Sequence, residues 1–194
     1  MKTQTYDIGG LDLSDDHYTV EQNLVRNKYE AVDSSGNTVL KGKQQTFKLK
    51  EAFPFVDENG EEAFTVKAQQ IRDYEGQYVL TDARSGEDIV VLDHEYSLLE
   101  QITGATWTIR DADTDAELAE ITSRQFVGLF RTGLLGNLIP HRYEITDADG
   151  GHVGTIAGEL SMKDRYEIEI EDASSVPREP VVAAAMVIDA IEGN

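Results

Sequence analysis

The stretch that decides the fold lies near the end of the 194-residue chain and reads Pro180-Val181-Val182-Ala183-Ala184-Ala185-Met186-Val187-Ile188-Asp189-Ala190-Ile191. Proline suits the first turn of a helix, and the alanines that follow favour a helix. Apolar residues occur on every side of this helix, so it has no polar face for solvent. Because about 11 residues at 1.5 Å each reach only about half of a 30 Å bilayer core, protein must enclose the helix.

Strand patterns dominate the rest of the chain. At four places an aromatic residue is followed by a small or apolar residue two positions later and by aspartate four positions later. Residues two apart in a strand share one face, so these pairs should face the core. The pairs are Tyr29/Ala31, Tyr78/Leu80, Trp107/Ile109 and Tyr143/Ile145.

Turns that begin with aspartate and end with glycine are expected behind these strands, because aspartate suits the first position of a turn and glycine the last. The pattern occurs at 33–36, 57–60, 82–86 and 147–150. A second strand returns after each turn. Together with a strand at 166–170, the sequence predicts about eleven or twelve strands.

The strands and the helix together predict a mainly β fold, a roughly twelve-stranded closed antiparallel β-barrel that encloses the helix at about 180–192. Larger barrels have room for a central helix, whereas small ones are filled by side chains. The alanines at 183, 184, 185 and 190 suit a helix confined in this way. The length fits one domain, which we assign to residues 1–194.

Three stretches resemble a known family: HRYEITDADGGHVGTI at 141–156, YEIEI at 166–170 and VIDAI at 187–191. Together with the order of the hairpins, they make the chain similar to the LURP-one-related proteins, which share their fold with the tubby C-terminal domain and the phospholipid scramblases. The resemblance implies a twelve-stranded barrel around a buried C-terminal helix. It also implies relatives that bind phosphoinositides or act on membrane lipids.

The chain is strongly acidic, with 37 acidic and 17 basic residues and a formal net charge of −20. This charge disfavours nucleic acid as a partner. The absence of cysteine excludes disulfides and thiol nucleophiles. Because the acids are scattered and lysines are few, we interpret the surface as one suited to molar salt, as in a halophilic archaeon. An ordinary acidic protein is the alternative.

Motifs for catalysis are missing from the sequence. It contains no nucleophile elbow, no phosphate loop and no His-Glu-x-x-His, and its four histidines have no paired metal spacing. We therefore expect no enzyme, no catalytic residue, no cofactor and no metal site. The N-terminus has no signal-peptide pattern, which leads us to expect a cytoplasmic protein, at most peripheral to a membrane.

One acidic cluster could ligate a cation. Asp111, Asp113 and Asp115 offer alternating carboxylates, but Ala116 and Thr122 stand where an EF-hand loop requires glycine and glutamate. A solvated turn is our interpretation, and a weak calcium or magnesium site is the alternative.

Two segments differ from the acidic remainder of the chain, one because it lacks acidic residues and one because it is rich in lysine. They supply the candidate ligand-binding residues. Residues 121–143 contain no carboxylate and carry Arg124, Arg131 and Arg142. This segment either exposes a patch for a membrane or partner or covers an end of the barrel. Residues 34–50 contain Lys41, Lys43, Lys48 and Lys50. Lys41 and Lys43 are two residues apart, as are Lys48 and Lys50, so in a strand each pair would lie on one face.

The lysine pairs form a candidate site for an anion or lipid headgroup. Alternatively, they only prevent edge pairing. The sequence thus predicts a non-enzymatic binding module of the tubby-like class that recognises a lipid headgroup or membrane surface. A ligand-free barrel with a structural or protein-interaction role is the alternative.

Overall fold

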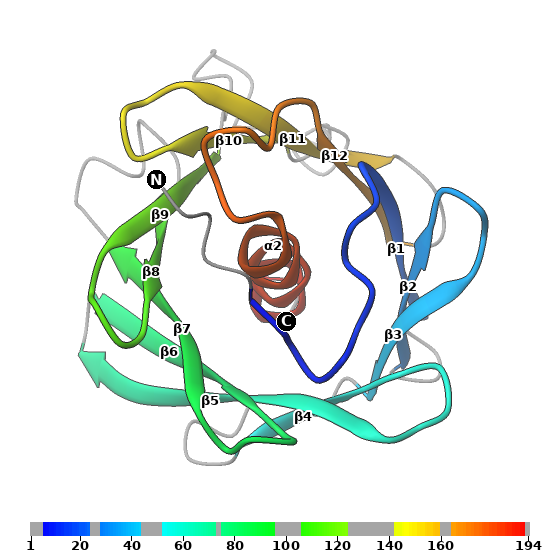
Figure 1. Ribbon diagram of the computed structural model, residues 1–194. Coiled ribbons are helices and arrows are strands. Elements are labelled where there is room, and N and C mark those ends of the chain that lie inside the picture. Colours follow the sequence, from blue (N-terminus) through cyan, green and yellow to red (C-terminus); the bar gives the residue numbers. More distant parts are fainter. Residues whose placement is uncertain are drawn as a thin grey trace, which may run out of the picture.

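A computed structural model describes residues 6–23, 28–43, 52–72, 75–95, 106–123, 142–159 and 164–192. In these residues, twelve antiparallel strands form a closed barrel around a helix (Figure 1). Each strand pairs with its neighbours in sequence, and β1 pairs with β12 to close the barrel. The elements are β1 (His17–Asn23), β2 (Lys28–Asp33), β3 (Thr38–Lys43), β4 (Phe53–Val56), β5 (Glu62–Arg72), β6 (Glu75–Asp82), β7 (Asp88–Glu95), β8 (Thr106–Asp111), β9 (Glu117–Ser123), β10 (Arg142–Asp147), β11 (His152–Glu159), β12 (Asp164–Ile170) and α2 (Arg178–Glu192).

The core lies between the barrel wall and the helix. Side chains alternate along a strand, so every second residue faces inward. The structure confirms the predicted core-facing pairs, of which Trp107 and Ile109 are completely buried and Tyr78 packs against the core from a half-buried position. The mainly β fold and the closed barrel of the sequence prediction are therefore correct.

The predicted turns all lie at one end of the barrel, which we call the turn rim (residues 33–37, 57–61, 82–87, 111–116 and 147–151). Each of the four predicted glycines has a positive φ, between 75° and 83°, and donates its amide to the carbonyl of the first aspartate. The turn between β8 and β9 uses Asp115 instead, with a φ of 57°. Glycine is thus replaced there by an aspartate that tolerates the left-handed region.

The helix runs along the barrel axis and begins at Arg178 rather than at Pro180. Pro180 still lies in the first turn, where its missing N–H costs no hydrogen bond. Residues 180–188 are buried without interruption. The prediction of a helix enclosed by protein on all sides is confirmed for these residues.

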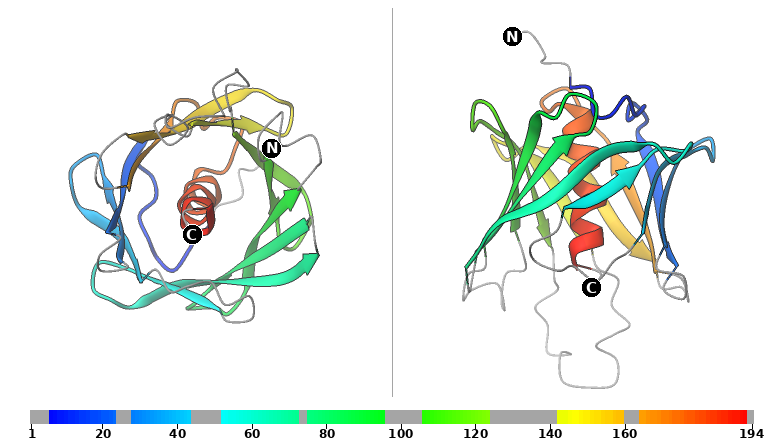
Figure 2. Two further views of the ribbon diagram at one scale, coloured as in Figure 1. Left: turned by 180° about the vertical axis from the view of Figure 1, so that it is seen from behind. Right: turned by 90° about the horizontal axis from the view of Figure 1, so that it is seen from below.

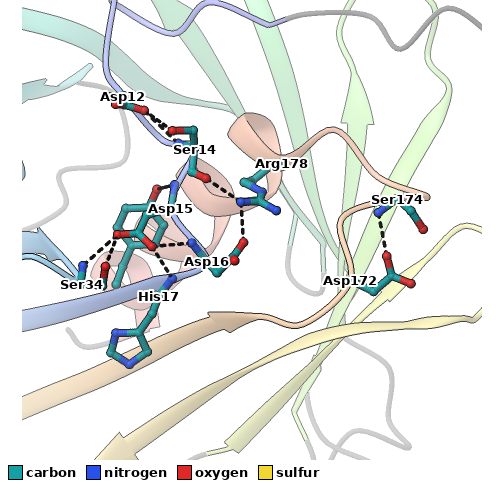
Figure 3. Close-up of polar contacts among 10 residues, drawn as sticks. Asp12, Ser14, Asp15, Asp16, His17, Ser34, Asp172, Ser174 and Arg178 are labelled. Carbon is teal, nitrogen blue, oxygen red and sulfur yellow. Dashed lines mark hydrogen bonds and ion pairs between the residues drawn. The ribbon is translucent and has the colours of Figure 1, made fainter.

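The N-terminal residues 6–16 cross the turn rim before the chain enters β1 (Figure 2). We call them the covering segment. Its Ile8 and Leu13 are buried in the core, and the amide of Gly9 donates a 2.6 Å hydrogen bond to Oδ1 of Asp82. Arg178 at the start of α2 pairs with Asp16 and donates to the carbonyl of Ser14 (Figure 3). The covering segment therefore joins the turn rim to the helix.

Candidate anion-binding surface on β2 and β3

The candidate surface is built from lysines on two neighbouring strands. Lys41 and Lys43 lie on β3, whereas Lys48 and Lys50 lie outside the described residues. The register of the β2–β3 hairpin adds Lys28, because Lys28 is paired with Lys43. Sequence reasoning missed Lys28. Counting outward from the turn at 33–37, with one residue allowed for the bulge between Ala31 and Val32, would have found it.

Lys41 is the best-defined member of the surface. It is half-buried and paired with Glu30, and its Nζ donates a 3.0 Å hydrogen bond to the carbonyl of Glu58 in the next turn. Oε1 of Glu30 accepts from the hydroxyl of Thr38 at 2.6 Å. Lys41 is therefore held towards the turn rim, while Lys28 and Lys43 occupy strand positions at the other end of the barrel.

The barrel is polarised along its axis. The described strand ends opposite the turn rim, which we call the opposite rim, carry both charges. Lys28, Lys43, Arg72 and Arg142 are balanced there by Glu75, Glu95, Glu159 and Asp164. Every turn of the turn rim carries carboxylates, namely Asp33, Asp57, Glu58, Glu61, Asp82, Glu87, Asp111, Asp113, Asp115, Asp147 and Asp149. An anionic surface would therefore meet the least repulsion when it approaches the opposite rim.

Arg142, the one arginine of segment 121–143 among the described residues, does not lie beside the lysines. Arg142 is exposed at the start of β10, and Arg124 and Arg131 lie outside the described residues. Between β10 and β3 stand β11, β12, β1 and β2, a separation of about 24 Å along the sheet at about 4.8 Å per strand. The described flanks of this segment are strand residues whose buried side chains are Ile121, Ser123 and Tyr143. Residues 124–141 lie outside the described residues. Whether they expose a binding patch or cover an end of the barrel therefore stays a prediction.

The acidic cluster at Asp111 forms a turn. Oδ1 of Asp111 accepts from the amide and the hydroxyl of Thr114 at 2.8 and 2.7 Å, and Oδ2 accepts from the Tyr6 hydroxyl at 2.6 Å. Burial alone would raise the pKa of Asp111, but these hydrogen bonds hold it below its usual value. Within the described part of the chain, no group of three acids or histidines is arranged to hold a metal ion.

Two histidines have contrasting surroundings. His94 on β7 is buried, and its ring stacks on Trp107 with 4.0 Å between the ring centroids. Burial lowers the pKa of His94 to about 4. His152 on β11 is exposed between Glu171 and Glu144, whose hydrogen bonds raise its pKa. The two carboxylates contact different ring nitrogens, so the three groups act as an ion-pair bridge on the outer wall.

The fold and the surface define a class of protein, a closed twelve-stranded antiparallel barrel that surrounds its own C-terminal helix and bears lysines on one hairpin. The chain belongs to the LURP-one-related family, whose model matches residues 38–189. None of the curated proteins matches the chain. A solved structure of a protein from Arabidopsis thaliana is similar, with 12% sequence identity, a TM-score of 0.38 and 91% of each chain covered. Among the described helices, none is long and apolar enough to cross a membrane.

Proposed function

We propose that this protein is a non-enzymatic binding module of the tubby-like class that recognises an anionic lipid headgroup through Lys28 and Lys43, while Lys41 is held at the turn rim. The pairing of Lys28 with Lys43 carries the proposal. Like charges at directly paired strand positions are unfavourable, and this pair occurs in a chain with few lysines. A bound anion would compensate the repulsion. We place the module at the cytoplasmic surface of a membrane, as a peripheral protein.

The charge polarity of the barrel supports this proposal. A negatively charged membrane repels the carboxylates of the turn rim and attracts the lysines of the opposite rim, so it favours one orientation of the barrel. Each lysine near an anionic surface contributes about 1 kcal/mol to binding. The two lysines of the opposite rim therefore give a weak, salt-sensitive attachment.

Vesicle flotation tests the proposal. The protein is mixed with vesicles of phosphatidylcholine alone, with added phosphatidylserine, or with added phosphoinositide, at about 0.1 M salt, where charges act over about 10 Å. We expect capture by the anionic vesicles and none by phosphatidylcholine. Competition by free inositol phosphate would assign the recognition to the phosphate groups. Absence of capture by every vesicle would overturn the proposal in favour of the ligand-free or protein-interaction barrel.

A charge reversal separates a binding role from a structural one. The affinity of the Lys43→Glu variant for anionic vesicles should be about tenfold lower, which corresponds to about 1.4 kcal/mol of binding free energy. It should also unfold at a slightly higher urea concentration, because an opposite-charge pair with Lys28 contributes roughly 0.2–1 kcal/mol. Lys67→Glu on β5 is the matched control, since Lys67 is exposed and paired with the uncharged Val79. Equal binding by both variants would contradict the assignment.

We also propose that the acidic surface is an adaptation to molar salt, as expected of a protein from a halophilic archaeon. The net charge of −20 supports this, because high salt screens the repulsion that such a charge creates. Headgroup binding by lysines would then be weak in the cell and would require several contacts at once. The salt dependence of stability, argued below, tests the adaptation separately from the binding.

A further inference from the structure

Among the described residues, the ladders of the barrel wall differ in length, and the ladder between β3 and β4, which we call the β3–β4 seam, is short (Figure 1). Its ladder contains two residue pairs, Lys41 with Val56 and Gly42 with Phe55. The other ladders between the described strands contain from four pairs, for β4–β5, to eight pairs, for β5–β6. The seam is therefore the shortest ladder in the described part of the wall.

Sequence features of both strands explain the short ladder. β4 has four residues and includes Pro54, which has no N–H to donate. A bulge between Phe55 and Val56 interrupts its pairing with β5 as well. On the other side of the seam, β3 carries Gly42, which gives the strand no side chain to pack and more backbone freedom.

The space beside Gly42 shows that this glycine is not required by crowding. A Cβ at this position would lie 3.6 Å from Cβ of Tyr29 and 3.7 Å from a ring carbon of Phe55, which are ordinary contact distances. An alanine would therefore fit and would add packing across the seam. Glycine instead leaves the two strands loosely joined.

Aromatic side chains lie directly behind the seam. Tyr29 and Phe55 meet edge to face with 6.1 Å between centroids, and Phe55 stacks on Phe64 at 4.7 Å. The helix backbone approaches the wall most extensively at β7, β8, β9 and β12, none of which borders the seam. Separation of β3 from β4 would therefore uncover aromatic surface while the helix kept its closest backbone neighbours.

We propose that the barrel opens laterally at the β3–β4 seam, uncovering Tyr29 and Phe55 while the other ladders stay paired. β3 remains joined to β2 by five pairs, and β4 remains joined to β5 by four. The opening is a conformational device of the wall itself. It does not depend on headgroup binding, so either proposal can fail without the other.

Native-state hydrogen exchange, followed residue by residue by NMR, tests the opening in the unmodified chain. Local openings exchange their amides faster than global unfolding does, and their rates respond little to added denaturant. Only alternate residues of an antiparallel strand bond to a given neighbour, and the hairpin bonds of Asp33 and Asp57 leave Lys41 and Val56 as the pair that bonds across the seam. We expect the amides of Lys41 and Val56 to exchange about tenfold faster, or more, than those of the β5–β6 ladder. Equal rates with equal denaturant dependence would overturn the proposal.

Engineered cross-links test it a second time, since the chain contains no cysteine. The Lys41→Cys/Val56→Cys variant places a cysteine pair across the seam, and Thr65→Cys/Thr81→Cys places a control pair across β5–β6. Oxidation of the first pair should slow exchange at the amides of residues 41 and 56 about tenfold, relative to the same protein reduced. Oxidation of the control pair should leave those two amides unchanged. Lateral opening would be contradicted if the disulfide across the seam left exchange unchanged. It would also be contradicted if the control disulfide slowed exchange at the seam equally.

Gly42→Ala offers a variant without a cross-link. Because the added methyl group fits between Tyr29 and Phe55, it should slow exchange at the seam by several-fold without changing the exchange of β5–β6. Faster exchange at the seam in a folded Gly42→Ala protein would show that the glycine packs the wall rather than loosening it.

Discussion

The hydroxyl of Tyr29 donates a 2.6 Å hydrogen bond to the carbonyl oxygen of Met186, and both groups are buried. This bond joins the barrel wall at β2 to the middle of the helix, across 157 positions of sequence. It is a polar contact in a core whose buried side chains are mainly apolar. It therefore fixes one position of the helix along the barrel axis, which apolar packing alone does not specify.

Removing this bond should cost a modest amount of stability. Tyr29→Phe keeps the ring that packs on Phe55 and leaves the Met186 carbonyl without the hydroxyl, so we expect a loss of about 1 kcal/mol. Urea unfolding followed by circular dichroism measures the loss. An unchanged midpoint would mean that the bond contributes nothing to the fold.

Replacing the partner on the helix by a charge should be far more severe. Met186 is completely buried, and a large-to-small change at such a site already costs about 2–5 kcal/mol out of a total of about 5–15. Met186→Asp should therefore give insoluble or molten protein. Lys67→Asp on the exposed face of β5 is the control and should fold normally. Soluble Met186→Asp protein with an unchanged near-UV spectrum would show that the helix is not the centre of the core.

The covering segment should depend on Gly9. Its φ is 59°, and a Cβ there would lie 2.3 Å from the carbonyl oxygen of Ala63. Gly9→Ala should therefore displace the segment and destabilise the protein by about 1–3 kcal/mol. Gly36→Ala is the matched control, because Gly36 has a φ of 81° with open space around it, so its change measures backbone strain alone. Equal losses for both variants would show that the contact with Ala63 carries no weight.

The covering segment also shows where sequence reasoning ended. The helix and the turns were predictable because an all-apolar stretch and the Asp-to-Gly spacing are local signals. Ile8 and Leu13 stand among glycines and acids without a strand or helix period, and their burial depends on distant groups such as Asp82. The local pattern of residues 6–16 therefore could not indicate that they cross the turn rim.

Only part of the candidate surface was predictable, because local spacing within one strand is visible in the sequence and pairing between strands is not. Lys41 and Lys43 are visible as a spacing of two within one strand, whereas Lys28 belongs to the surface only through the hairpin register. That register contains a bulge, and a bulge shifts every pair beyond it by one residue. The position of Arg142 followed only from the closure of the barrel, which separates β10 from β3 by four strands.

His94 should make the protein less stable in mild acid. The unfolded chain binds a proton at this residue near its usual pKa of 6.5, but the buried, stacked ring in the folded protein binds it only near 4. Since the unfolded state binds more protons between these values, stability is complete above about pH 6.5 and is lost as the pH falls towards 4. At about 1.4 kcal/mol per pKa unit, the loss approaches roughly 3 kcal/mol.

Urea unfolding at a series of pH values measures this loss, and His94→Phe should flatten it because phenylalanine stacks on Trp107 without titrating. His152 acts in the opposite sense, since its raised pKa gives stability below about 6.5 that is lost at higher pH. The lowered pKa of Asp15, about 2, acts only in stronger acid. A wild-type profile that is flat between pH 6.5 and 4 would contradict the role of His94.

Stability should rise with salt if the acidic surface is an adaptation. At about 0.1 M KCl, charges repel one another over about 10 Å, and this range falls to about 3 Å at 1 M. Every turn of the turn rim carries carboxylates, so most of the gain should come at low salt, with a further gain at about 3 M from stronger apolar burial. Asp113→Asn removes one exposed carboxylate beside Asp111 and Asp115, so it should raise the melting temperature at low salt and leave it unchanged at about 3 M. Equal melting temperatures of the two proteins at about 3 M would show that salt screens the removed charge. A melting temperature independent of KCl in both proteins would exclude salt adaptation and leave the acid excess without a role in stability.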